Sequence, residues 1–300
     1  MVAQPTPGSS GPQPSLDRRA ELTEFLRNRR SRLKPADVGL PDFGRRRRVP
    51  GLRREELAQL AGVSVAYYTR LEQGGGNNVS TEVLDSIARA LRLTETEHAH
   101  LVHLARPKSQ RRRPPARAQQ LRSPVRSLLD SLETVPAYAI GRRTEILGWN
   151  RLAAALFGDW SALEPAERNW ARLTFFAEST RDLFVDWEDK AADVVALLRV
   201  EAGYSPDDPQ LAALVGELSV RSAEFRRFWA VHDVKQKCHG SKRLRHPLVG
   251  SMTLYCESFR LADDPDQALV TYHAEPGSPS AEALRLLASW GVDATTAPTG

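Results

Sequence analysis

The first third of the chain repeats short amphipathic segments separated by turn signals. Residues 22–33 place Leu and Phe at helical spacing opposite a row of Arg, and segments beginning near residues 53, 64, 80 and 94 continue the same period. Ser64 and Ser80 stand at expected N-cap positions, and Gly62 supplies a left-handed turn between the second and third segments. The pattern therefore predicts five short helices, with a glycine turn joining the second to the third.

The rest of the chain mixes helical and alternating periods. A helix opening at Ser123, a strand–turn–strand and a short helix that starts after Asn150 and stops at Gly158 come first. Two long helices, three strands and a final helix follow, at residues 180–202, 208–229, 241–247, 248–261, 268–274 and 280–290. This order predicts an α+β unit in which an antiparallel sheet carries helices on one side.

Composition divides the chain into five parts. Residues 1–16 and 293–300 are expected to be tails, the first because it is rich in Pro, Gly, Ser and Gln. Residues 107–122 are basic, broken by prolines and poor in apolar side chains, which is typical of an extended linker. The sequence therefore predicts a helical domain at 17–106 and an α+β domain at 123–292.

Charge is distributed unevenly between these parts. Residues 1–120 contain 22 Lys and Arg against 12 Asp and Glu, a net charge of +10, whereas residues 121–300 have a net charge of −5. This asymmetry indicates that the N-terminal part meets a polyanion, with double-stranded DNA as the expected partner. A solvated basic surface that serves solubility is the alternative.

Membrane proteins and disulfide-rich proteins are not expected. No apolar run approaches the ~20 residues of a membrane span, and residues 1–15 lack the pattern of a signal peptide. The two cysteines, Cys238 and Cys256, form no CxxC pair. We therefore expect a cytoplasmic protein in a reducing compartment, associated with the nucleoid through DNA and without a membrane partner.

Three motifs lie at fixed spacing within residues 52–74: Glu56-Leu57-Ala58, Ala61-Gly62-Val63-Ser64 and Leu71-Glu72-x-Gly74. They resemble the helix-turn-helix of the XRE, or lambda repressor/Cro-like, family. The Arg-rich lead into residues 49–56, the run at 67–73 and the Trp149-Asn150 pair resemble the MmyB-like subfamily of regulators. The resemblance implies an all-α, five-helix, lambda-repressor-like domain followed by an α+β, PAS-like domain that binds a small molecule and supports dimerisation.

In a helix-turn-helix the second helix of the pair enters the major groove. Here that helix begins at Ser64, and its inward stripe is expected to hold Tyr68 and Leu71, packed on Leu57 and Leu60. Base and phosphate contacts are then predicted from the outward positions, from the start of the preceding helix and from the arginine run before it. The predicted DNA-binding residues are Arg45, Arg46, Arg47, Arg48, Arg53, Arg54, Ser64, Val65, Ala66, Tyr67, Thr69 and Arg70.

Neither a metal site nor an enzymatic motif is predicted. The cluster His232, Cys238, His239 and His246 fits no zinc spacing, and no GxSxG, HExxH or P-loop pattern occurs, so neither catalysis nor a cofactor is expected. Aromatic side chains in the C-terminal part are candidates for an apolar ligand pocket, with ordinary core packing as the alternative for each. They are Trp149, Phe184, Trp187, Trp229 and Tyr255.

The sequence thus predicts a sequence-specific DNA-binding transcription regulator that senses a small apolar effector and is not an enzyme. A homodimer is expected because one five-helix module reads only a half-site, and Val125, Leu128 and Leu129 are candidates for its interface. Two other classes stay open: an enzyme that carries a DNA-binding appendage, and a non-catalytic module that recruits another protein.

Overall fold

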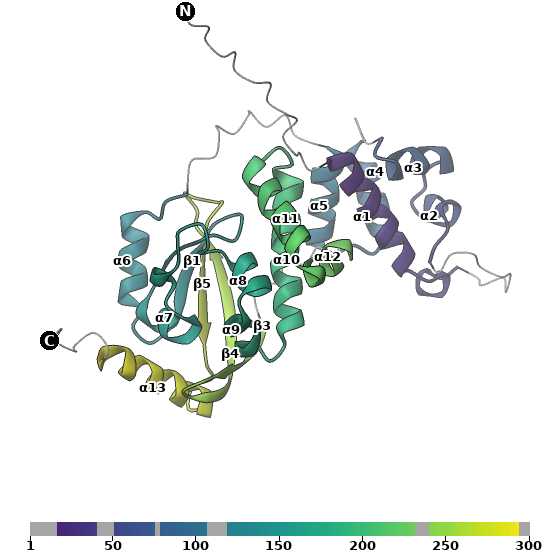
Figure 1. Ribbon diagram of the computed structural model, residues 1–300. Helices are drawn as coiled ribbons and strands as arrows, with labels where there is room; N and C mark the ends of the chain where they lie inside the picture. Colours follow the sequence, from purple (N-terminus) through teal and green to yellow (C-terminus); the bar gives the residue numbers. More distant parts are fainter. Residues whose placement is uncertain (1–16, 41–50, 76–78, 107–118, 232–239, 294–300) are drawn as a thin grey trace, which may run out of the picture.

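The computed structural model describes residues 17–40, 51–75, 79–106, 119–231 and 240–293. A group of helices formed by the N-terminal part lies beside a sheet with its own helices, formed by the C-terminal part (Figure 1). Among the described residues no helix is long and apolar enough to cross a membrane.

The N-terminal part folds into the five helices that the sequence predicts. They are α1 (Arg18–Arg32), α2 (Arg54–Leu60), α3 (Val65–Glu72), α4 (Thr81–Ala90) and α5 (Glu95–Ala105), with a 3-10 turn η1 (Pro35–Val38) after α1. Ser64 Oγ accepts from Tyr67 N at 3.1 Å, and Thr94 forms a capping box with Glu97. Gly62 has φ of +66°, the left-handed conformation that the turn between α2 and α3 requires.

A buried ion pair joins the first three helices. Arg30 on α1 donates through Nε and Nη2 to the Glu72 carboxylate at 2.9 and 3.0 Å, and its Nη1 donates to Leu52 O at 2.6 Å. Arg54 at the start of α2 adds a contact of 2.9 Å from Nη2 to Glu72 Oε1. The side chain of Glu72 is only 1 % exposed, so the end of α3 is held to α1 and α2 by charge-assisted hydrogen bonds.

The C-terminal part contains a five-stranded antiparallel sheet in the order β2-β1-β5-β4-β3. Its strands are β1 (Ala137–Ile140), β2 (Ile146–Trp149), β3 (Gly240–His246), β4 (Gly250–Arg260) and β5 (Ala268–His273). One face carries Tyr138, Leu254 and Tyr272 into the largest apolar cluster of this part. Tyr255 and Phe259 alternate onto the other face and are exposed. The α+β prediction is confirmed.

Helices cover both faces of this sheet, which corrects the expectation that they lie on one side. Helices α7 (Arg151–Phe157), α8 (Trp170–Phe176), α9 (Glu178–Leu183), α10 (Trp187–Tyr204) and α13 (Pro279–Asp293) share the large apolar cluster. Helix α6 (Ser123–Ser131) packs Leu129 against Ala137, Ala139 and Leu269 on the opposite face. These small alanine side chains leave room for α6, a pairing that helical period alone does not reveal.

The two predicted long helices are each divided in two. Residues 180–202 form the end of α9 and most of α10, because Phe184 bridges to Leu244 and Val185 N donates to Arg243 O at 3.0 Å. Residues 208–229 form α11 (Pro209–Arg221) and α12 (Ala223–Ala230), where Ser222 caps the second helix. Within the described residues of the C-terminal part, α8 and the 3-10 turn η2 (Trp160–Ala162) were also not predicted.

Asn150 connects four backbone groups where β2 ends and α7 begins. Its Oδ1 accepts from Ala137 N at 3.1 Å and from Ala153 N at 2.8 Å. Its Nδ2 donates to Leu132 O at 2.6 Å and to Val135 O at 2.7 Å. The buried amide thus joins α7, β1 and the connection from α6, which explains the place of Asn150 in the predicted Trp-Asn pair.

We expect Asn150→Asp to lower the free energy of unfolding by about 2–4 kcal/mol at neutral pH. The substitution replaces the donating amide by a carboxylate oxygen that faces two carbonyl oxygens in a buried site. Urea unfolding followed by far-UV circular dichroism measures the change. Gln210→Glu makes the same chemical change at an exposed position and should shift stability by no more than about 0.5 kcal/mol. Equal effects of the two substitutions would contradict this role of Asn150.

The pKa of the Glu72 carboxyl is set by two opposing effects. Burial alone would raise the pKa of Glu72, but the hydrogen bonds and charge of Arg30, with Tyr68 and Arg54, overcome burial and hold that pKa below its ordinary value. The carboxylate therefore stabilises the fold above its ordinary pKa, and this contribution is lost as pH falls through the lower pKa of the folded state.

Glu72→Gln should lower the free energy of unfolding by about 3–5 kcal/mol at neutral pH, because it leaves the buried Arg30 charge without its counter-ion. The variant should also lose part of the acid dependence of stability, measured by urea unfolding at neutral and acid pH. Glu55→Gln, an exposed substitution on α2, serves as the control. An unchanged acid slope in Glu72→Gln would show that the pair does not titrate as described.

Candidate nucleic-acid interface and ligand cavity

Helix α3 presents one polar and weakly apolar face to solvent. Val65 is 43 % exposed, Ala66 and Arg70 are also exposed, and Thr69 is half-buried at the edge of the same face. Tyr68 and Leu71 are buried in the core with Leu57, as the sequence pattern predicts. Leu60 differs from its expected place in the stripe, since it lies at the end of α2 and is exposed.

Tyr67 and Arg70 form a contact at the margin of this face. The guanidinium carbon of Arg70 lies 5.5 Å from the centre of the Tyr67 ring, within the range of a cation–π interaction. Tyr67 itself is half-buried against the helical core. The contact therefore limits the directions that the Arg70 side chain can take along the exposed face of α3.

The start of α2 carries two exposed arginines, and one of them contacts the end of α3. Arg53 is the exposed N-cap residue, whose backbone N donates to Glu56 Oε2 at 2.7 Å. Arg54 keeps about half of its side chain exposed while Glu72 holds its guanidinium. A guanidinium has five N–H donors, so Arg54 retains donors for a phosphate beside the amides of the helix N-terminus. The predicted arginines Arg45, Arg46, Arg47 and Arg48 lie outside the described residues.

The five aromatic side chains expected to line a pocket lie in separate places. Phe184 and Trp187 are buried in the main apolar cluster, and Trp149 packs at its edge. Trp229 stacks on Phe225 in a second cluster, and Tyr255 stands on the exposed face of β4. The five do not enclose one site, because alternation along β4 and the helix breaks send them to different surfaces.

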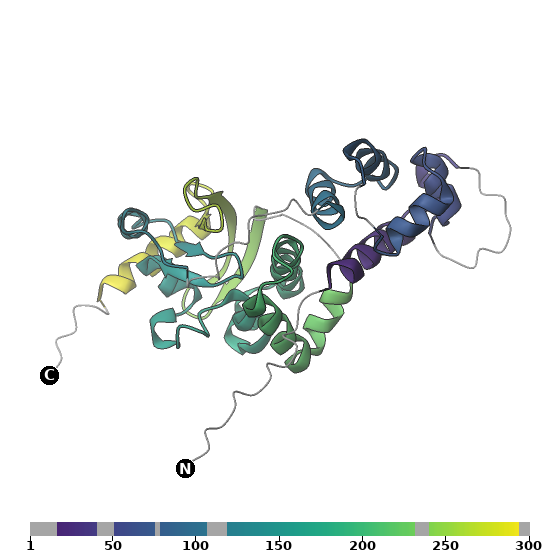
Figure 2. The same cartoon turned by 90° about the horizontal axis from the view of Figure 1, so that it is seen from above.

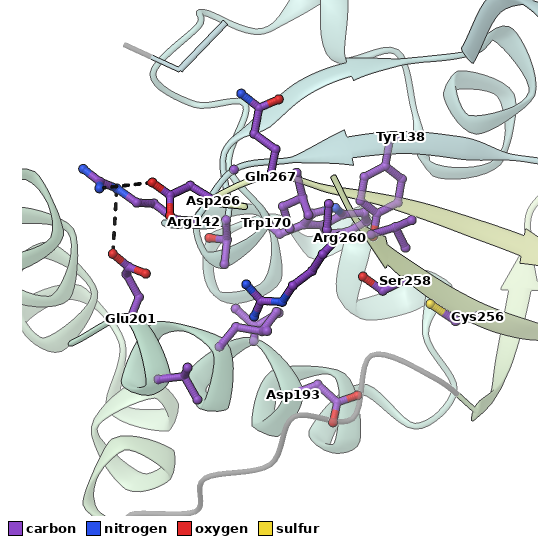
Figure 3. A pocket seen from close by; sticks show the side chains of 18 of the residues that line it. Tyr138, Arg142, Trp170, Asp193, Glu201, Cys256, Ser258, Arg260, Asp266 and Gln267 are labelled. Carbon is purple, nitrogen blue, oxygen red and sulfur yellow. Dashed lines mark ion pairs between the residues drawn. The ribbon is translucent and has the colours of Figure 1, made fainter. Parts of the chain in front are cut away.

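A cavity of about 570 Å³ lies instead between the sheet and α10 (Figure 3). Tyr138 on β1, Cys256 on β4 and Tyr272 on β5 line it from the sheet. Helix α10 lines it from the opposite side along its length, with α8 contributing Trp170. Its volume is within the usual range of small-molecule sites.

Charged side chains around the cavity largely pair with one another. Figure 3 shows Arg142 between Glu201 and Asp266, with Nε–Oε1 and Nη1–Oδ2 distances of 3.8 and 3.7 Å. Lys242 Nζ lies 2.5 Å from Asp193 Oδ2. The lining has four basic and four acidic side chains, so it has no net charge that would select a strongly charged ligand.

Hydrogen-bonding groups stand among the apolar surface of the cavity. Burial raises the pKa of Tyr272 well above its ordinary value, so its hydroxyl stays protonated and neutral. Lys190 lies with Nζ 4.0 Å from the centre of the Trp170 ring, a cation–π contact inside the fold. Lys190, Trp170 and Tyr272 were missed by the sequence analysis. Charged residues within the apolar stripe of α10, Lys190 among them, were a signal in the sequence.

Of the four His and Cys residues for which no metal site was predicted, His246 lies within the described residues. His232, Cys238 and His239 lie outside them. His246 is buried, and this burial lowers its pKa. Its Nε2 donates to Ala155 O at 3.1 Å, and Nδ1 accepts from Leu248 N at 3.3 Å. Both ring nitrogens are therefore used inside the fold, and the described ranges contain no group of ligands able to hold a metal ion.

Comparison with known proteins separates the chain into the same two parts. A family model described as a helix-turn-helix domain matches residues 21–101. A second, described as the MmyB-like transcription regulator ligand binding domain, matches residues 121–287, more than half of the chain. A search among curated proteins finds no match. The chain belongs to the MmyB-like family of XRE-type transcription regulators, which joins a DNA-binding helix-turn-helix to a ligand-binding domain.

Proposed function

We propose that the chain recognises a specific DNA sequence through α3 and that a small, largely apolar molecule in the cavity beneath α10 controls this recognition. Recognition of DNA through α3 is supported by the exposed face of this helix, which is formed by Val65, Ala66, Thr69 and Arg70. Val65 and Ala66 are suited to thymine methyl groups, and Thr69 and Arg70 to hydrogen bonds with base edges or phosphates.

Phosphate contacts are assigned to the start of α2. Arg53 and Arg54 are exposed there, and the carboxylate of Glu72 orients Arg54 from inside the fold. Such contacts position the protein on any duplex and do not read its sequence. Arg45, Arg46, Arg47 and Arg48 precede this point in the chain and are proposed to add phosphate or minor-groove contacts.

The balance of the cavity lining supports a largely apolar effector. Ile140, Leu197 and Val270 provide aliphatic surface, and the four acidic groups balance the four basic groups. The Tyr272 hydroxyl and the Trp170 indole give an apolar molecule a few polar groups to orient it. The cavity therefore replaces the scattered aromatic side chains as the proposed effector site.

A homodimer is proposed on the geometry of DNA, because two half-sites on one face of the duplex lie roughly 34 Å apart. Of the three interface candidates on α6, only Leu128 is exposed, at 47 %. Val125 and Leu129 are buried, with Leu129 packed against the sheet. The part of the proposed interface that α6 supplies is therefore reduced to Leu128.

Substitutions at α2 and α3 should have different effects on DNA binding. Arg54→Ala should weaken binding to all sequences and reduce the slope of log K against log salt by about 1, because one phosphate contact is lost. Thr69→Ala should change the preference among sequences by about 1 kcal/mol with the salt slope unchanged. Fluorescence anisotropy against operator and scrambled duplexes at several salt concentrations measures both.

Arg285→Ala removes the same charge from an exposed position on α13 and is the matched control, with no expected change in either measure. If Thr69→Ala and Val65→Ala both leave the sequence preference as it is, α3 does not read bases in this orientation. A salt slope for Arg54→Ala equal to that of the control would remove Arg54 from the phosphate contacts.

The cavity is tested by filling it. Ser258 on β4 lines the cavity, whereas Thr253 on the same strand is exposed on the opposite face. Ser258→Trp should weaken binding of anilinonaphthalene sulfonate, an anionic probe whose aromatic rings bind apolar sites, about tenfold, or about 1.4 kcal/mol, because indole occupies the space. Thr253→Trp should leave the fluorescence titration unchanged. Equal affinities of the two variants would place the probe, and the proposed effector site, elsewhere.

A further inference from the structure

Helix α10 lies between the sheet and the N-terminal helices (Figures 1 and 2). The cavity is on the sheet side of α10, and the N-terminal core packs near the end of this helix. Val200 and Tyr204, near its end, line the cavity and also pack against the apolar core of the N-terminal part. The Tyr204 ring lies 3.9 Å from the ring of His103 on α5, measured between centres. The same two side chains therefore form part of the cavity wall and part of the contact between the two parts of the protein.

Close packing between α10 and α5 depends on Gly203. A Cβ atom at this position would lie 2.7 Å from His100 Cε1, closer than real Cβ contacts allow. His100 and Gly203 are both buried. A side chain at position 203 would therefore require His100 or the helix itself to move.

Arg199 ties α10 to α1 and α12. Its side chain is 0 % exposed, its Nη1 pairs with the Glu21 carboxylate on α1, and its Nη2 donates to Trp229 O on α12. The guanidinium also lies 4.3 Å from the centre of the Trp229 ring. A buried guanidinium that lost these partners would carry an uncompensated charge, so the pairing strongly favours the docked arrangement.

A second contact between the two parts lies away from the cavity. Asn28 Nδ2 and Arg32 Nη2, both on α1, donate to Val231 O at 2.8 and 2.9 Å. Val231 directly follows α12, which packs against α10. Neither Asn28 nor Val231 lines the cavity. A substitution at Asn28 can therefore weaken the docking of α1 on the α10–α12 unit without changing the residues that line the cavity.

We propose that cavity occupancy and the docking of α1 and α5 onto α10 stabilise each other, so that an effector fixes the orientation of the DNA-binding helices. The inference rests on the cavity being the effector site, as proposed above. Val200 and Tyr204 hold their places in the wall because α5 packs behind them. A ligand that fits this wall binds the docked form better, and the coupling free energy acts equally in both directions.

The experiment compares probe affinity in docking variants of the full chain. Glu21→Gln and Asn28→Ala remove separate contacts between α1 and the α10–α12 unit, and neither residue lines the cavity. Each should raise the Kd for anilinonaphthalene sulfonate about fivefold. Glu95→Gln changes the same charge at an exposed position on α5 and should leave the Kd unchanged. In the wild-type chain, saturating probe should slow amide hydrogen exchange in α5, and Ser258→Trp should abolish that protection.

The outcomes separate this inference from the proposed function. If wild-type protein does not bind the probe, or if Ser258→Trp binds it equally well, the effector site falls and the inference with it. If the probe binds in the cavity but both docking variants keep the wild-type Kd, the coupling alone is overturned. A lower Kd in these variants, or faster exchange in α5 with probe, also overturns it, because the two events would then oppose each other.

Discussion

A guanidinium removed from water must have its charge and donors satisfied, and Arg199 obtains this from two distant parts of the chain. Its partners are Glu21 on α1, nearly 180 positions earlier in the sequence, and the backbone oxygen of Trp229 at the end of α12. This requirement places the helical N-terminal part against α10 and not merely near it. The contact between Tyr204 and His103, and the close approach of His100 to Gly203, follow from the same placement, because α5 packs beside α1 in one core.

Buried arginines also change how the charge of the N-terminal part is understood. The surplus of basic residues indicated a polyanionic partner, yet some of these residues form buried ion pairs that stabilise the fold. Arg30 is paired with Glu72, and Arg29 Nη1 lies 2.8 Å from Glu97 Oε1 with both side chains buried. Among the described predicted contacts, the cations left at the surface are Arg53, Arg54 and Arg70. A charge count therefore identifies the class of partner, whereas only burial identifies the side chains that face it.

Local signals predicted the N-terminal helices well, because caps and glycine turns act within one or two turns of the chain. Ser64, Ser80 and Gly62 each have the structural role expected of them. The breaks at Phe184 and Ser222 were not predicted. The break at Phe184 depends on pairing with Leu244, which lies on a strand 60 positions later in the sequence. The side of the sheet occupied by α6 likewise depends on small side chains in β1, which helical period cannot report.

The cavity was missed for a related reason. Its wall joins β1, α8, α10, β3, β4 and β5, so no short stretch of sequence contains it. Large aromatic residues are a signal for the core, since Tyr138, Phe157, Trp160 and Trp170 form edge-to-face pairs there. The more informative feature was charge within an apolar helix. Lys190, Arg199 and Glu201 interrupt the apolar stripe of α10, and all three are buried at the cavity or at the docking contact.

The ion pair at Glu72 connects α3 to the helix that docks on the C-terminal part. Glu72 at the end of α3 is held by Arg30 on α1 and by Arg54 on α2, so one buried carboxylate joins these three helices. We therefore infer that a displacement of α1 would carry α2 and α3 with it. In the proposed dimer the separation of the two α3 helices depends on this orientation, so the proposed effector would change the affinity for DNA without contacting the side chains proposed to read bases.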